Sequence, residues 1–145
     1  MRAYLVFLTL ISCVFGEYHV IFRNKCSSKV EVKDARGITY STLGPNEQEP
    51  VVFDKNLSFR KQFRNGNDPG PILYLSQKKG IGHYRVNYAY GFVTPVVVRP
   101  IGSNGPTIVC EKNQCQSVEN GKVHQSRIGK LTAAEPHFEV TYCPK

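Results

Sequence analysis

Two β-rich stretches decide the fold of this chain: YHVIFRNKC, residues 18–26, and PHFEVTYCPK, residues 136–145. Each contains β-branched and aromatic residues, which favour strands, and each leads into a cysteine. A bond between Cys26 and Cys143 would tie the first strand to the last and enclose almost the whole chain. In the chain-entropy account, a loop of that size removes roughly 4–5 kcal/mol of unfolded-state entropy. The two stretches therefore predict a domain that is closed by its own ends.

Residues 1–16 have the pattern of a secretory signal peptide. Arg2 precedes the apolar run AYLVFLTLI, residues 3–11, and small residues up to Gly16 suit signal peptidase. We expect cleavage after Gly16 and a single domain over residues 17–145. A signal anchor is the alternative, but the run is too short to span a membrane. The sequence therefore predicts a secreted, extracellular protein.

The cysteines point to disulfides. Cleavage would remove Cys13 and leave four cysteines, an even number that predicts two bonds in an oxidising compartment. Four cysteines allow three pairings, and the simplest joins Cys110 to Cys115 and Cys26 to Cys143. A zinc site is the alternative, but there is no C-x-x-C and no histidine at ligand spacing. We therefore expect disulfides, with no metal and no cofactor.

The basic charge is the main compositional guide to partners. The whole chain carries +8, and the loss of Arg2 leaves 18 basic against 11 acidic residues, a net charge of +7. Such a surplus favours acidic lipid, polysaccharide, nucleic acid or protein surfaces, although solubility explains it equally well. The basic residues are scattered, which argues against nucleic acid.

Strand and turn patterns fill the rest of the chain, and no helix is expected. The strand-like runs recur at spacings near ten residues, which gives about nine strands and favours a β-sandwich or barrel. Turns are predicted at residues 34–37 and 44–46, and a loop at residues 65–71. The polar segment 112–130 is predicted to be a long surface loop.

Aromatic and basic residues gather in the middle of the chain. LSFRKQFR, residues 57–64, interleaves the two kinds, as a glycan- or base-contacting surface does. A strand with one face in the core explains the same pattern. Tyrosines then follow at high density and can form a sugar-binding platform, although they also build sandwich cores. A glycosylation sequon begins at Asn56. The candidate binding residues are Arg60, Arg64, Tyr74, Tyr84, Arg85, Tyr88 and Tyr90.

No catalytic motif is present. The histidines lie in unrelated contexts, without H-E-x-x-H, G-x-S-x-G or a phosphate-binding loop. His83, Arg85 and Glu139 could supply the base, the phosphate-binding group and the acid of a nuclease-like site, but no spacing links them. We therefore expect no enzyme and keep a nuclease-like or RNA-binding protein as an alternative.

Several segments, taken in order, resemble the thaumatin-like (pathogenesis-related 5) family. The resemblance implies a thaumatin-like β-sandwich in which the first and last cysteines pair. The cysteine-rich second region of the family shrinks here to residues 116–136, which contain no cysteine. The similar segments are VIFRNKCS (20–27), LGPNE (43–47), YRVN (84–87), YGFVTPV (90–96), CEKNQC (110–115) and VTYCP (140–144).

The resemblance also bears on function. Positions of the family's acidic cleft fall at Arg85, Tyr90 and Leu73, so the carboxylates of that cleft are missing. The signal peptide, the cysteines near both ends, the basic surplus and the tyrosine-rich central strands lead us to expect a non-catalytic protein of the defence or effector type that binds a cell-wall glycan or an extracellular protein. Inhibition of secreted proteases or amylases, an activity known in the family, is the alternative, with residues 65–71 as the candidate inhibitory loop.

Overall fold

Thirteen strands in two sheets make up the part of the chain that the computed structural model describes. That part is residues 17–144 without 35, 55–57, 67–70, 79–80, 88–93, 112–113, 125–127 and 133–136. At strand residues 17–18, 53–54, 58–64, 77–78 and 128–132, only the backbone is described. The strands are β1 (Glu17–Asn24), β2 (Val30–Lys33), β3 (Thr39–Leu43), β4 (Gln48–Asp54), β5 (Ser58–Asn65), β6 (Ile72–Lys78), β7 (Ile81–Asn87), β8 (Val96–Ile101), β9 (Thr107–Glu111), β10 (Gln114–Glu119), β11 (Lys122–His124), β12 (Ile128–Thr132) and β13 (His137–Tyr142).

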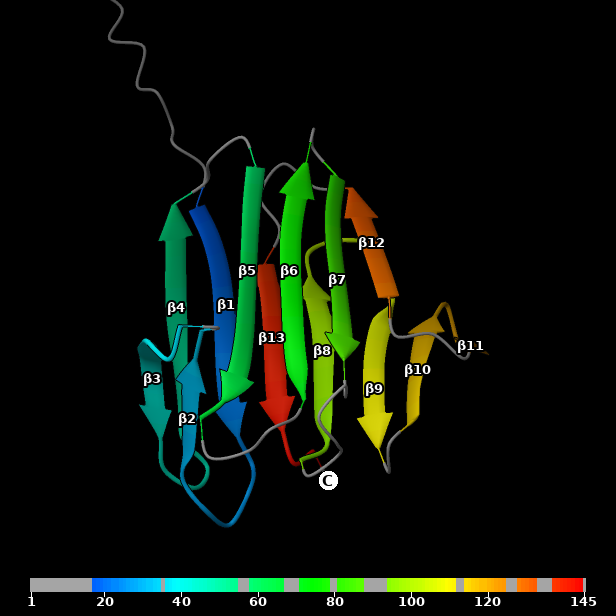
Figure 1. Ribbon diagram of the computed structural model, residues 1–145. Coiled ribbons are helices and arrows are strands. Elements are labelled where there is room, and N and C mark those ends of the chain that lie inside the picture. Colours follow the sequence, from blue (N-terminus) through cyan, green and yellow to red (C-terminus); the bar gives the residue numbers. More distant parts are fainter. Residues whose placement is uncertain are drawn as a thin grey trace, which may run out of the picture.

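The first and last strands pair in parallel inside the seven-stranded sheet, whose order is β11-β10-β9-β8-β13-β1-β4 (Figure 1). His19 lies opposite His137 at one end of the pair, and Asn24 lies opposite Tyr142 at the other. Just beyond that second end, the disulfide Cys26–Cys143 joins residues whose Cα atoms are 5.0 Å apart. The expected bond between the two ends of the domain is confirmed.

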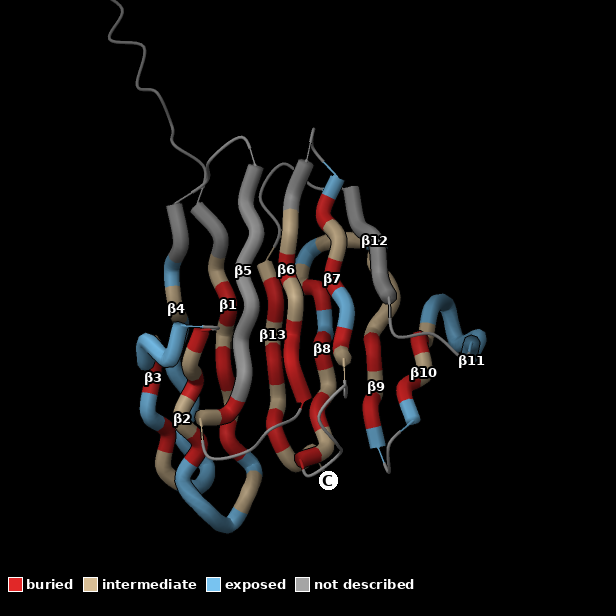
Figure 2. Tube along the Cα trace, viewed as in Figure 1, coloured by how far each residue is buried: buried red, intermediate tan, exposed pale blue. Residues whose placement is uncertain are grey.

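The six-stranded sheet, of order β12-β7-β6-β5-β2-β3, faces the first sheet, and the core lies between them (Figure 1). Buried residues alternate with half-buried or exposed ones along most described strands, as Figure 2 shows, because successive side chains of a strand point to opposite sides. In β13, Phe138, Val140 and Tyr142 are buried, whereas His137 and Glu139 are not. The all-β sandwich is therefore as expected. No helix of the described part is long and apolar enough to cross a membrane.

The β3–β4 connection joins the edges of the two sheets. Its turn begins at Gly44, whose backbone N–H donates to the Glu47 carboxylate at 2.6 Å, and Asn46 has a positive φ of 64°. The hydroxyl of Ser41 on β3 donates to the carboxylate of Glu49 on β4 at 2.6 Å. The turn predicted at this point is confirmed, and it closes one side of the sandwich.

The segment 112–130 corrects the sequence prediction, because it is not one long loop. It contains β10, β11 and the start of β12, which help to raise the strand count from about nine to thirteen. Cys115 lies opposite Cys110 in the β9–β10 ladder and is bonded to it, with the Cα atoms 4.0 Å apart. Asn120 and Gly121 both have positive φ and form the two-residue turn between β10 and β11. The segment was misjudged because small or polar residues occupy the inward positions of β10.

Candidate binding surface

Tyr74 and Arg85 meet on the outer face of the six-stranded sheet. They lie opposite each other on β6 and β7, and the guanidinium carbon of Arg85 is 4.5 Å from the centroid of the Tyr74 ring. Along β7, the alternate residues Gly82, Tyr84 and Val86 are buried, so the residues between them face outward. Arg85 is exposed and Tyr74 is half-buried. The cationic guanidinium is attracted to the face of the ring, and the Arg85 residue stays exposed to solvent.

Tyr84 does not belong to this surface, which corrects the prediction. Its side chain is 1% exposed, and its ring packs edge-on against Phe138 at a centroid distance of 5.2 Å. Its hydroxyl donates to the carbonyl oxygen of Pro106. Burial, with a further contribution from Glu119, raises the pKa of Tyr84. Tyr84 faces the core because it lies between two outward positions, His83 and Arg85, of one strand.

The other candidate binding residues are placed only in part. The β5–β6 register sets Arg60 opposite Ser76 and Arg64 opposite Ile72. For both arginines the structure describes the backbone and not the side chain. Several predicted features fall outside the described residues altogether: the signal peptide 1–16, Asn56, residues 67–70 of the candidate inhibitory loop, Tyr88 and Tyr90.

The structure does not bring His83, Arg85 and Glu139 together, so the nuclease-like arrangement is wrong. His83 and Arg85 face outward from β7, whereas Glu139 faces outward from β13 in the other sheet. The carboxylate of Glu139 is instead bound by Arg23 at 2.9 Å and by Arg99 at 3.0 Å. Among the described residues, no group of three or more histidine, cysteine, aspartate or glutamate side chains is placed to hold a metal.

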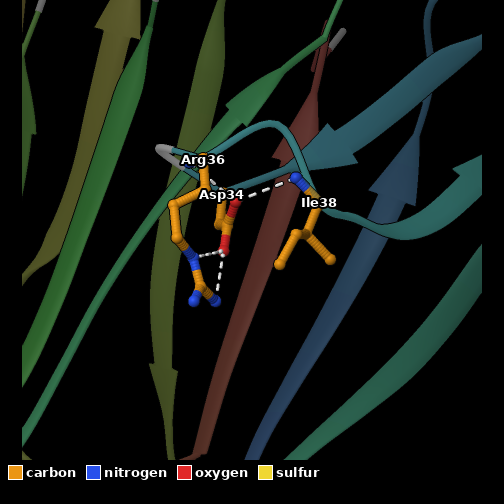
Figure 3. Close-up of polar contacts among 3 residues, drawn as sticks. All are labelled: Asp34, Arg36 and Ile38. Carbon is orange, nitrogen blue, oxygen red and sulfur yellow. Dashed lines mark hydrogen bonds and ion pairs between the residues drawn. The ribbon is translucent and has the colours of Figure 1, made fainter.

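A buried carboxylate fixes the turn between β2 and β3 (Figure 3). Asp34 Oδ1 accepts hydrogen bonds from the backbone N–H groups of Arg36 at 2.8 Å and Ile38 at 2.9 Å. Asp34 Oδ2 accepts two from the Arg36 guanidinium, at 3.1 and 3.2 Å. Burial raises the pKa of Asp34, but the hydrogen bonds from Ile38 and Arg36 outweigh it and leave the pKa below its ordinary value. The turn is therefore held in one shape.

This fixed turn presents Arg36 and Ile38 to solvent, with 71% of the Arg36 side chain and 48% of Ile38 exposed. Gly37, whose φ is +84°, donates its N–H to the Asp34 carbonyl at 3.1 Å. The sequence predicted a turn at residues 34–37 but no binding role for it. The available indication was an aspartate placed two residues before an Arg-Gly pair, since aspartate side chains bond to the backbone of the residues that follow.

The comparisons with known proteins agree with this architecture. No protein-family model and no curated protein matches the sequence. The solved structure of the thaumatin-like xylanase inhibitor TLXI matches with a TM-score of 0.55 and 16% identity, over 86% of this chain and 99% of that one. The protein elicitor MoHrip2 from Magnaporthe oryzae matches with a TM-score of 0.60 and 15% identity, over 88% of this chain and 99% of that one. The paired sheets, the bond between the first and last strands and these two similarities show that this chain has the thaumatin-like fold.

Proposed function

We propose that this protein is a secreted, non-catalytic binding protein that recognises an acidic surface on an extracellular partner. The observation that carries the proposal is the exposed Arg85 stacked on Tyr74. The two disulfides support an oxidising, extracellular setting. The similar structures, named as a xylanase inhibitor and a protein elicitor, support a binding role rather than catalysis.

The Tyr74–Arg85 contact favours an acidic partner over a neutral sugar. A sugar that stacks on tyrosine needs an open ring face, and here the guanidinium of Arg85 lies over the ring. A planar guanidinium held in place can donate two parallel hydrogen bonds to one carboxylate. The net charge, +8 for the whole chain and +7 after the expected cleavage, attracts acidic partners from a distance. Between an acidic protein and an acidic cell-wall polysaccharide we favour the protein, since the name of one similar structure specifies an enzyme target.

Binding measurements on variants of Arg85 test the proposal. The probes are a panel of purified secreted xylanases, proteases and amylases of differing charge, together with polygalacturonate and a neutral glucan. We expect the protein to select acidic members of the enzyme panel. Arg85→Gln should weaken that binding by roughly tenfold or more, and Arg85→Lys, which keeps the charge but loses the planar fork, should recover only part of it.

Lys25→Gln is the matched control, because it removes one exposed charge from another part of the chain. A role of net charge alone predicts equal losses for Lys25→Gln and Arg85→Gln, and that outcome would contradict the proposed surface. If the protein binds polygalacturonate more tightly than every acidic enzyme, its partner is an acidic polysaccharide and not a protein. Preference for the neutral glucan would reject an acidic partner.

Inhibition of a secreted hydrolase through the β2–β3 turn is a second candidate function. A loop that is already held in its bound shape loses little conformational entropy on binding, and the Asp34 hydrogen bonds provide such a restraint. The test is inhibition of the same enzyme panel by wild type and by Gly37→Ala. No atom lies within 4 Å of the Cβ that alanine would add, so the change acts through the positive φ alone. Unchanged inhibition by Gly37→Ala would exclude this turn.

A further inference from the structure

The outer face of the seven-stranded sheet carries two histidines that the proposed function does not use. His19 on β1 lies opposite His137 on β13, and the two strands run side by side in Figure 1. The ring centroids are 4.7 Å apart, with the rings inclined at 78°. Both side chains are partly exposed. Edge-to-face packing of two rings is one explanation of the contact. Two adjacent imidazoles are also a ligand pair for a transition metal.

One ring nitrogen of this pair lacks a hydrogen bond. Nδ1 of His137 is buried, and no described residue donates to it or accepts from it. Buried polar atoms almost always have a partner, so an exception points to water, an ion or a functional role. Glu139, the next residue on the same side of β13, is already bound by Arg23 at 2.9 Å and Arg99 at 3.0 Å. Its carboxylate therefore does not account for the open position on His137.

We propose that His19 and His137 together bind a divalent transition metal ion of the copper, nickel and zinc group. Imidazole nitrogen suits these ions, whereas magnesium and calcium prefer oxygen ligands. Metal–nitrogen bonds of about 2.0–2.1 Å to both rings would require the rings to turn about their side-chain bonds from the edge-to-face arrangement. The described residues offer no set of three ligands, so water completes the coordination. Glu139, two residues from His137 or about 6.6 Å along the strand, is already paired with Arg23 and Arg99 and is not counted as a ligand.

A metal ion bound by His19 and His137 would link β1 to β13 far from the disulfide. The disulfide ties β1 to β13 just beyond Asn24 and Tyr142, whereas the histidines lie at the other end of the pairing. From His19 to Asn24 the strand extends about 17 Å, at about 3.3 Å per residue. A metal ion would thus hold the second end of the same strand pair. Since the ion would bind the folded chain, the melting temperature should rise with the free concentration of the ion.

Calorimetric titration of the tag-free, disulfide-bonded protein with Zn²⁺ and Cu²⁺ tests the proposal. We expect one ion per chain for wild type and no binding of Mg²⁺. Binding should be lost in His137→Asn and in His19→Asn, and kept in His124→Asn, whose histidine is exposed on β11. No saturable binding by wild type, or equal binding by His137→Asn and His124→Asn, would overturn the proposal.

His137→Asn is the decisive variant. Cleavage after Gly16 would make His19 the third residue of the mature chain, and a free amino terminus followed by a third-position histidine binds Cu²⁺ unaided. Binding that survives in His137→Asn but not in His19→Asn would place the ion at that amino terminus and reject the pair.

A measurement on unaltered protein guards against variants that fail to fold. Ring ¹⁵N resonances of wild type, recorded with rising Zn²⁺, should shift for His19 and His137 and stay unchanged for His83 and His124. Equal shifts of all four histidines would indicate unspecific binding and would reject the site. The same titration with Mg²⁺ should move none of them.

Discussion

At the scale of single residues, Asn24 joins several segments of the chain. Its side-chain N–H groups lie 2.8–3.1 Å from the carbonyl oxygens of Ser28, Leu43 and Gly44, and its own side-chain oxygen accepts the backbone N–H of Cys26 at 2.8 Å. An amide has only two N–H donors, so three carbonyl oxygens share them. The residue is fully buried, at 0% exposure. Asn24 thus fixes the approach of the chain to the Cys26–Cys143 bond.

Asn24→Asp should lower the free energy of unfolding by roughly 2–4 kcal/mol at pH 7. The carboxylate would have no hydrogen to donate and would bring its charge close to carbonyl oxygens in a buried site. Urea denaturation measures the loss. Asn104→Asp, at an exposed position, is the matched control and should stay within about 0.5 kcal/mol of wild type. A loss for Asn24→Asp no larger than that of the control would contradict the role given to Asn24.

At the scale of an element, strand β2 carries its own ion pairs. Glu31 lies 2.6 Å from the amine of Lys29 and 2.9 Å from that of Lys33. Hydrogen bonds from Lys29 and then Lys33 lower the pKa of Glu31 from 4.5 to about 2. The Lys33 side chain crosses over Gly66, where an added Cβ would come within 2.5 Å of it. The glycine that directly follows β5 therefore leaves room for the Lys33 side chain of the second ion pair.

Glu31→Gln should flatten the acid limb of the stability profile. Because the pKa of Glu31 is lower in the folded than in the unfolded chain, its ion pairs stabilise the fold above pH 4.5 and lose that effect as the pH falls toward 2. The pairs are near the surface, so the effect is small. Thermal melts of wild type and Glu31→Gln from about pH 2 to pH 7 should converge below pH 4.5 and run parallel above about pH 5. Glu111→Gln, at an exposed position, serves as the control, and a constant gap between wild type and Glu31→Gln at every pH would refute the assignment.

Elements also show which parts of the fold a sequence can predict. The alternation along β7 is enough to predict that Tyr84 is buried, since Tyr84 lies on the same side of the strand as Val86 and on the opposite side from Arg85. The Asn120-Gly121 pair likewise predicts the β10–β11 hairpin, because that dipeptide suits a turn with two positive φ values. The contact between Tyr74 and Arg85 could not be predicted in this way. It depends on the pairing register of β6 with β7, and the sequence pattern of a single strand does not specify that register.

For the whole molecule, the two disulfides close loops of very different size. Cys26 and Cys143 are 117 residues apart, whereas Cys110 and Cys115 are five apart and already lie opposite each other in a hairpin. The chain-entropy account assigns about 5 kcal/mol to the large loop and about 2 kcal/mol to the small one. The bond between the chain ends should therefore contribute most to the stability of the sandwich.

The double variant Cys26→Ala/Cys143→Ala should lose about 3 kcal/mol more stability than Cys110→Ala/Cys115→Ala, as measured by urea denaturation. Core packing acts against this difference in stability loss. Cys110 and Cys115 are 0% and 4% exposed, so alanine there leaves space in the core, which adds to the cost of losing the smaller loop. A larger loss for the 26–143 variant would therefore appear in spite of this bias. Equal losses of stability would have one of two explanations: the core packing of Cys110 and Cys115 offsets the entropy difference, or the unfolded chain keeps its ends together. Reduction of the wild-type protein distinguishes these explanations, because it opens both loops and leaves every sulfur atom in the chain. A small loss of stability on reduction would point to residual contact between β1 and β13 in the unfolded chain.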